Sequence, residues 1–452
     1  MTLKDQLWMK GLWGLNIEEQ QAQEEGRDLG AVMDELRSLQ KDSRDPKLYE
    51  QAEALYRRIQ ELPLRQGYPY VEPDSLEGIR AARAQELELP TRGEGRQALR
   101  GRVLGAWQGR LAGCLLGQPV EGWRRERILG FLKDTGNLPI SRYLSSDVGQ
   151  ALRERYKIKD GPGGYGAERI SWINNIQGLQ EDDDINYTVL ALKLVSGSGR
   201  GFDSEQLALE WLNSLPLLRT CTAERAAYLN LARLIPPPES AVFANPYREW
   251  IGAQIRADLY GYINPGRPRE AAEMAWRDAR VSHVKNGIYG AMFAAAMIAA
   301  AFVTSDPGQI VAAGMAQIPA CSRLHEALEE LLAGWRAKQP LAAFQERFYK
   351  KYDEANPHIW CHTIPNALIV AAGVLYHGMD FTASIGFGVT SGFDTDCNAA
   401  TIGSILGAAL GSAGLPEGWL LPMGASIRTC VPGYDGMAIT ELADRTLALI
   451  PE

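Results

Sequence analysis

Apolar side chains recur at helical spacing along most of the chain. The stretch LYEQAEALYRRIQEL has apolar residues at steps of four and three, which line one face of a helix: Leu48, Ala52, Leu55, Ile59 and Leu62. The stretch RLHEALEELLAGW repeats this spacing. We find no repeated alternation of apolar and polar residues, no βαβ period and no GxGxxG after a strand. The pattern therefore predicts an all-α protein.

The same pattern divides the chain into two parts. Residues 1–96 predict a helical hairpin, with one helix from about Ile17 to Leu39, a turn at SRDP and a second helix over LYEQAEALYRRIQEL. The linker-like sequence ELPTRGEGRQ follows. We therefore expect an N-terminal helical extension over residues 1–96 and a second domain over residues 97–452. Nothing in the extension suggests chemistry. We expect it to pack on the main domain or to join two copies into a homo-oligomer.

A stripe of glycines opens the second part. In GAWQGRLAGCLLGQPVEGW, glycines recur at every fourth position: Gly105, Gly109, Gly113 and Gly117. On a helix these positions fall along one face, which then carries no side chains. We expect the backbone of another element to approach this helix closely.

One apolar segment resembles a membrane span. Residues 287–303, GIYGAMFAAAMIAAAFV, are at the lower limit of length for crossing a bilayer. Alanine, which is only weakly apolar, makes up much of the segment, and Lys285 and His283 stand just before it. We therefore interpret it as a buried helix and expect no contact with a membrane.

Composition and charge exclude several classes of protein. The chain has 452 residues, of which 46% are hydrophobic and 23% charged, as in an ordinary folded protein. A net charge of −8 argues against general nucleic-acid binding. The six cysteines are far apart and form no CxxC, so neither a zinc site nor a disulfide framework is indicated. Lys10 interrupts the apolar N-terminus, which is therefore not a signal peptide, and we expect a cytoplasmic protein.

Two acid-rich segments each precede an apolar helix. Asp182, Asp183 and Asp184 stand before one helix, and Asp394 and Asp396 stand in a turn before AATIGSILGAALG. Taken alone, the first cluster also fits a solvated helix cap. If the two helix starts face each other across a bundle, their carboxylates suit hard cations such as Mg²⁺ or Mn²⁺. Shared carboxylates would hold two such ions roughly 3.5–4 Å apart.

These motifs, in this order and preceded by GRLAGCLLGQPVE, resemble the ADP-ribosylglycohydrolase family. That family includes the hydrolase that reactivates ADP-ribosylated dinitrogenase reductase, and the J1 crystallins. The resemblance covers about residues 97–450 and implies a compact all-α domain with two Mg²⁺ or Mn²⁺ ions in a cleft. It implies five metal ligands: Asp182, Asp183, Asp184, Asp394 and Asp396. It also places Glu121 in the cleft.

The chain departs from the family pattern close to these ligands. The family often has a threonine directly after DxD, where this chain has Cys397, and a thiol is a poor ligand for Mg²⁺. Asp182 replaces the first ligand threonine of the family. Gly392-Phe393 stands where the family frequently has two glycines.

The resemblance also implies a set of substrate contacts: Gly252, Arg256, His283, Asn286 and Gly392. The polar loop of the family maps on Ile251-Gly252-Ala253, so we expect altered contacts to ADP-ribose. Taken alone, a histidine ahead of an apolar helix also fits a hydrogen-bonded structural residue. His358 and His362 lie four residues apart without a third ligand in the sequence, and we expect both to be structural.

The leading hypothesis is a metal-dependent hydrolase that cleaves the glycosidic bond of an ADP-ribosyl group on a protein or a small molecule. Glu121 is the expected catalytic acid or base. The alternative is a non-catalytic ADP-ribose-binding or crystallin-like structural protein, which the changes at Cys397 and Ala253 favour. A terpene-synthase-like Mg²⁺ enzyme would need DDxxD, and here Asn186 and Tyr187 stand at the required offsets.

Overall fold

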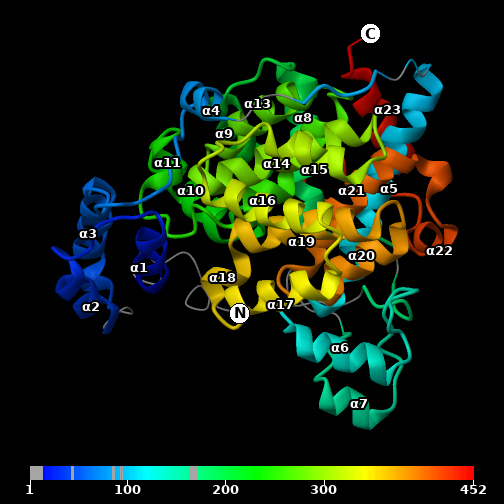
Figure 1. The fold of residues 1–452 in the computed structure, drawn as a ribbon, viewed down its shortest axis with the longest axis horizontal. Helices are drawn as coiled ribbons and strands as arrows, with labels where there is room; N and C mark the ends of the chain where they lie inside the picture. The colour runs from blue at the N-terminus through cyan, green and yellow to red at the C-terminus, as the bar shows by residue number, and fades with distance from the viewer. Residues whose placement is uncertain are drawn as a thin grey trace.

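All regular elements of the described residues are helical. The structure is a computed structural model, and it describes residues 14–41, 45–83, 87–91, 93, 95–161, 171–176 and 178–451. Within these residues the helices form one large body, with α1, α2 and α3 at one side and α6 and α7 on a lower projection (Figure 1). No strand occurs among the described residues. The predicted all-α class is confirmed.

The extension has four short α-helices among its described residues, and the first three surround a small core of their own. Its helices are α1 (Leu15–Glu24), α2 (Met33–Lys41), α3 (Tyr49–Glu61) and α4 (Leu76–Ala82). Leu36, Leu55 and Ile59 are among the side chains of this core. The single helix predicted from Ile17 to Leu39 is wrong, because Gly26 takes a φ of +82° and ends α1. The predicted turn at SRDP lies mostly outside the described residues.

Buried charges join the extension to the main domain. Arg248 is fully buried and pairs with Glu18 at 2.6 Å and with Glu25 at 2.7 Å, both on or next to α1. Glu72, before α4, pairs with Arg323 at 2.9 Å. The extension therefore packs on the main domain through ion pairs in its own chain. Contact with a second copy stays a prediction, as does the domain boundary near residue 96.

The main domain is built around one close helix pair. Its central helices lie side by side in Figure 1: α5 (Arg96–Gly117), α14 (Lys285–Ala301), α19 (Thr363–His377), α20 (Phe381–Thr390) and α21 (Thr395–Leu410). The glycine stripe of α5 faces α21. A Cβ on Gly109 would lie 2.1 Å from the carbonyl oxygen of Gly403, and one on Gly117 would lie 2.4 Å from the Cα of Asp396. Only glycine allows this approach, as the stripe predicts.

The remaining helices surround this core. The α-helices are α6 (Arg125–Asp134), α7 (Gln150–Arg155), α8 (Asp183–Ser198), α9 (Ser204–Ser214), α10 (Thr222–Ala232), α11 (Glu239–Val242), α12 (Asp258–Tyr262), α13 (Pro268–Ala279), α15 (Pro307–Met315), α16 (Arg323–Arg336), α17 (Leu341–Lys351), α18 (Pro357–Cys361), α22 (Glu417–Leu420) and α23 (Ile439–Ala448). Short 3-10 helices link several of them: η2 (Pro46–Leu48), η3 (Gln118–Val120), η4 (Leu217–Arg219), η5 (Ile251–Arg256), η6 (Ser412–Gly414) and η7 (Leu421–Met423).

The Ala-rich segment forms α14 and lies in the middle of the domain. Every residue of this helix from Asn286 to Ala301 is buried against other parts of the chain. Among the described residues, no helix combines the length and the apolar character needed to cross a membrane. The interpretation of this segment as a buried helix is confirmed.

The contact between α5 and α21 gives a first prediction. Replacing Gly113 by alanine places a Cβ 2.0 Å from the carbonyl oxygen of Ala399, so the two backbones must separate. We expect a loss of about 1–3 kcal/mol in the free energy of unfolding, the usual cost of overpacking. Gly101→Ala on the same helix is the control, since its Cβ meets nothing within 4 Å. It should gain about 0.5–1 kcal/mol. Equal effects in urea denaturation would contradict the close contact.

The junction of the extension gives a second prediction. Arg248→Met leaves Glu18 buried without its cation and leaves Glu25 with Lys285 alone. We expect a loss of about 3–5 kcal/mol in the free energy of unfolding, which is typical when one partner of a buried pair is removed. Arg445→Met is the control, because its pair with Glu441 is exposed and worth about 0–1 kcal/mol. If chemical denaturation gave both variants the same loss, the junction would not be a stabilising one.

Candidate metal centre

Three segments of the chain deliver acidic side chains to one place. Asp182 is the N-cap of α8, Asp394 is the N-cap of α21, and Glu121 follows η3 at the end of α5. Because Gly117 of α5 lies against the backbone of Asp396, the ends of α5 and α21 are fixed beside each other. Oxygens of Asp184 and Asp396 and the sulfur of Cys397 lie within 4.8 Å of one another. The structure thus brings the two acidic motifs together.

Glu121 belongs to the same electrostatic environment. Burial first, and then repulsion from neighbouring carboxylates that include Glu121, raises the pKa of Asp183 and of Asp396. Asp183 also feels Asp394. Glu121, Asp182, Asp184 and Asp394 thus each raise the pKa of both Asp183 and Asp396, although they come from distant parts of the sequence.

Hydrogen-bond donors of the protein already serve one side of the cluster. The backbone N–H of Asp184 donates to Asp182 Oδ1 at 3.0 Å, and Gln118 Nε2 donates to Asp182 Oδ2 at 2.9 Å. Arg110 donates to Asp184 Oδ1 at 2.9 Å, and the Cys397 thiol donates to Asp184 Oδ2 at 3.0 Å. Both carboxylates have thus found partners within the chain.

On the other side of the cluster, one carboxylate oxygen lacks such a partner. Asp396 Oδ1 is buried and, within the described residues, meets no hydrogen-bond donor. Burial raises the pKa of Asp183, Asp394 and Asp396, and like charges nearby add to the shift. A divalent cation that prefers oxygen ligands would neutralise such carboxylates. The donor set fits Mg²⁺ or Mn²⁺, whereas burial raises the pKa of the Cys397 thiol and keeps it protonated.

The turn before α21 holds Gly392 and Phe393 in left-handed conformations. Gly392 has a φ of +71° and Phe393 a φ of +56°. A Cβ on Gly392 would lie 2.4 Å from Glu354 Oε2, which accepts from the backbone N–H of Arg125. Phe393 is fully buried and packs on Phe348. Gly392 therefore shapes the turn that carries Asp394, and its predicted contact to substrate stays a prediction.

The predicted substrate residues near η5 lie inside the protein. Arg256 is 1% exposed and pairs with Glu224 and Asp278. A Cβ on Gly252 would lie 2.0 Å from Glu224 Oε1, so this glycine makes room for that carboxylate. His283 is fully buried, and burial first, then the charge of Arg256, holds its pKa well below the usual value. These contacts give no support to direct substrate binding by Arg256 or His283.

Asn286 serves the junction with the extension. Its amide nitrogen donates to Glu72 at 2.8 Å and to Glu249 at 3.0 Å, and its oxygen accepts from the backbone N–H of Leu324. The side chain is fully buried. Its amide nitrogen and oxygen thus have partners within the chain, and the contact to substrate that the resemblance implies stays a prediction.

A separate cluster, which the sequence did not indicate, joins His358 and His362 to Glu24 of α1. Ligand atoms of the three residues lie within 4.8 Å of one another. However, His358 Nδ1 accepts from Trp250 Nε1 and His362 Nδ1 accepts from the backbone N–H of Ile364. Each neutral ring therefore carries its proton on Nε2, the atom that faces Glu24. A metal would need both Nε2 atoms unprotonated. The cluster therefore fits a contact between α1 and the main domain better than a metal site, with His358 Nε2 hydrogen-bonded to Glu24 and His362 Nε2 at 3.7 Å from the same oxygen.

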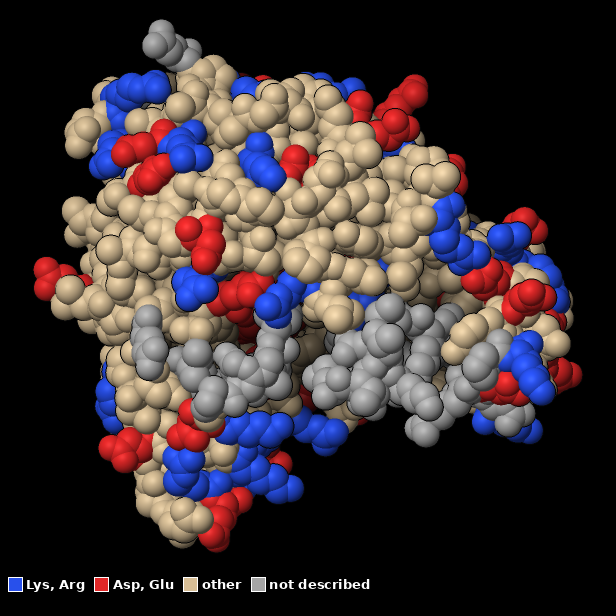
Figure 2. Space-filling view, turned by 180° about the vertical axis from the view of Figure 1, so that it is seen from behind, with Lys and Arg blue, Asp and Glu red and all other residues tan. Residues whose placement is uncertain are grey.

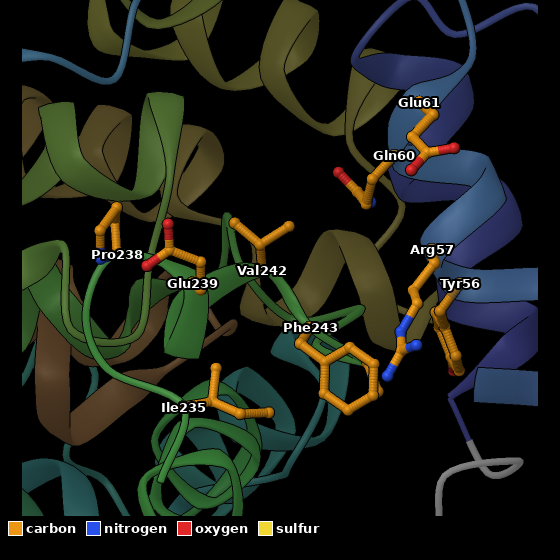
Figure 3. A pocket seen from close by; sticks show the side chains of 10 residues that line it. Tyr56, Arg57, Gln60, Glu61, Ile235, Pro238, Glu239, Val242 and Phe243 are labelled. Carbon is orange, nitrogen blue, oxygen red and sulfur yellow. The ribbon is translucent and has the colours of Figure 1, made fainter. Parts of the chain in front are cut away.

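A cavity of about 380 Å³ lies elsewhere, between α3 and the segment around α11 (Figure 3). Mostly apolar side chains line it, and the guanidinium of Arg57 stacks on Phe243 at 4.8 Å from the ring centroid. None of the six clustered acids lines this cavity. It therefore does not belong to the candidate metal centre.

Fold and site together define an all-α protein with a buried carboxylate centre suited to a divalent cation. The family model described as ADP-ribosylglycohydrolase matches residues 95–452. The chain belongs to this family. Family membership supports a glycohydrolase-type function and use of a metal.

Comparisons with individual proteins add little to this. One similar solved structure, an "ADP-ribosylglycohydrolase-related protein complex", is 18% identical, covers 78% of this chain and 98% of its own, and gives a TM-score of 0.48. No curated protein matches the chain.

The raised pKa of Asp396 gives a third prediction, concerning stability and pH. A carboxyl with a pKa raised in the folded state destabilises the fold as pH rises above about 4, where the unfolded chain ionises. In EDTA at pH 7.5, Asp396→Asn should therefore stabilise the protein by about 1 kcal/mol or more, the scale of one unsatisfied buried group. The gain should vanish near pH 4. The buried histidines contribute equally to the pH dependence of stability in both proteins, so their contributions cancel in the difference.

Adding Mn²⁺ provides the control for this prediction. Wild type should then gain stability by mass action, about 2.7 kcal/mol at a hundred times Kd, and the variant should gain much less. The order of the two proteins in thermal unfolding should reverse. The same order with and without Mn²⁺ would contradict a role of Asp396 in binding the ion.

Proposed function

We propose that this chain is a metal-dependent hydrolase that cleaves the glycosidic bond of an ADP-ribosyl group on a protein or a small-molecule conjugate. The observation that carries the proposal is the convergence of Glu121, Asp183, Asp394 and Asp396, with a buried oxygen of Asp396 left without a donor. Family membership over residues 95–452 supports the bond type. The leaving group stays open.

The residues of the centre have separate tasks in this proposal. Asp183, Asp394 and Asp396 would hold the cation. When bound, a Mg²⁺ or Mn²⁺ ion would attract the ribose hydroxyls by its positive charge and lower the pKa of coordinated water. Glu121 lies at the partly exposed edge of the cluster and would accept the proton of the attacking water or assist the leaving group. Positive charge that develops on the ribose is stabilised by the surrounding carboxylates.

A basic surface lies on the lower projection of the molecule. Figure 2 shows Lys and Arg side chains gathered there, next to a hollow in which acidic atoms are visible. Exposed basic residues of this projection include Arg124, Arg155, Lys157 and Lys159. Arg124 follows Glu121 closely in the chain. Such a surface would attract the diphosphate of an ADP-ribosyl group toward the centre.

The free thiols of all six cysteines fit a reducing compartment, and we place the proposed activity in the cytoplasm.

A second candidate function is binding of ADP-ribose without turnover. Two observations favour it: Asp184 is held by Arg110, and Cys397 replaces the family threonine. The two candidates differ in whether ADP-ribose is released from a conjugate.

The fourth prediction tests turnover. Wild type should release ADP-ribose from at least one of a panel of arginine-linked, serine-linked and small-molecule ADP-ribosyl conjugates, in Mg²⁺ or Mn²⁺ and not in EDTA. Glu121→Gln should lower kcat by about 10²–10⁴, the contribution typical of a general acid or base. Asp396→Asn should lower metal affinity and turnover together, by about tenfold or more.

Glu354→Gln is the matched control, since this carboxylate supports the Gly392 turn through the backbone of Arg125 and does not belong to the cluster. It should retain most activity. Tight binding of ADP-ribose without release from any conjugate would favour the binding candidate. If wild type neither bound nor released ADP-ribose, the proposed function would be wrong.

A further inference from the structure

Arg110 is a fully buried cation in the middle of the acidic centre. It lies on α5, between Gly109 and the end of the glycine stripe, and its side chain is 0% exposed. Its guanidinium lies 2.9 Å from Asp184 Oδ1 and 2.9 Å from Asp258 Oδ1. The same group donates to the backbone oxygens of Asp184 and Ile255. Partners from α8, η5 and α12 thus fix it in place.

Asp184 is the residue that two separate groups of potential ligands share. Its oxygens lie within 4.8 Å of Cys114 and Asp182 on one side, and within 4.8 Å of Asp396 and Cys397 on the other. A carboxylate in this position is where two ions of a pair would be bridged. Here its Oδ1 faces Arg110 and its Oδ2 faces the Cys397 thiol.

The two groups differ in the donors that surround them. In the group of Cys114, Asp182 and Asp184, the carboxylate oxygens accept from Gln118, from the backbone and from Arg110. In the group of Asp184, Asp396 and Cys397, Asp396 Oδ1 is buried and meets no donor among the described residues. Positive charge is therefore supplied by the chain itself on one side and is lacking on the other.

We infer that this centre binds one divalent cation instead of two, with the guanidinium of Arg110 as a permanent internal cation in place of the second. The ion binds on the Asp396 side. A second ion beside Asp184 would lie close to the guanidinium, and two positive groups at such a distance repel strongly in a buried site. Thiols of Cys114 and Cys397 are poor substitutes for oxygen ligands.

The inference rests on the proposed function only in assuming that the centre binds a divalent cation. Its test is the number of Mn²⁺ ions bound to the intact wild-type chain, measured by calorimetry and by equilibrium dialysis with metal analysis. We expect one ion per chain, with any second ion bound at least about 100-fold more weakly. Electron paramagnetic resonance should show isolated Mn²⁺ without exchange coupling. Two tightly bound, coupled ions, or none, would overturn the inference.

Variants then show whether Arg110 or Cys397 limits the centre to one ion. Arg110→Met combined with Asp258→Asn removes the cation and its other partner while leaving Asp184, and this double variant should bind two Mn²⁺ ions. Asp258→Asn alone is the matched control and should bind one. Cys397→Thr should also bind one, because Arg110 remains. Two ions in Cys397→Thr would overturn the role given to Arg110.

Two outcomes distinguish this inference from the proposed function. One bound ion without release of ADP-ribose from any conjugate leaves the inference standing and refutes the hydrolase. Two bound ions with release refute the inference and leave the hydrolase standing. If the double variant fails to fold, as judged by circular dichroism, the wild-type stoichiometry and the Cys397→Thr result still decide the question.

Discussion

The candidate centre depends on the backbone contact between α5 and α21. Four glycines of α5 face α21, and at each of them a Cβ would lie within 2.6 Å of a backbone atom of that helix or of the residue after it. The pair ends where Gly117 meets Asp396, so that Glu121 follows this contact after η3 and Asp394 precedes it as the N-cap of α21. Since the two backbones cannot slide without a clash, sterics fix the relative position of Glu121, the proposed general acid or base, and the DxD turn.

Much of this arrangement could be predicted from the sequence because it rests on local patterns. Glycines at every fourth position from Gly105 to Gly117 indicate a helix face without side chains. Acidic residues before two apolar helices indicate a shared centre. The predicted helix from Ile17 to Leu39 was wrong because one glycine with a positive φ, Gly26, outweighs the helical composition around it.

The partners of buried charges could not be predicted in the same way. Arg110 pairs with Asp184 and Asp258 across long stretches of sequence, and Asn286 contacts Glu72 in the extension. Nothing in the spacing of these residues marks them as pairs, because only the tertiary fold brings them together. The resemblance implies substrate contacts for Asn286 and Arg256 and gives no hint of the partners that the structure shows for both inside the protein, and those substrate contacts stay predictions.

The junction with the extension and the acidic centre both bury acidic side chains, but they differ in how much positive charge the chain supplies to them. At the junction, Glu18, Glu25 and Glu72 enter the protein and pair with Arg248, Lys285 and Arg323. At the centre, Arg110 neutralises only part of the acidic cluster, and burial raises the pKa of the remaining aspartates. The buried acids at the junction thus meet cations of the same chain, although burial still raises the pKa of Glu18 and of Glu249. Beside Glu121, Asp396 Oδ1 meets no hydrogen-bond donor among the described residues, and this unmet demand for positive charge is what supports the proposed cation site.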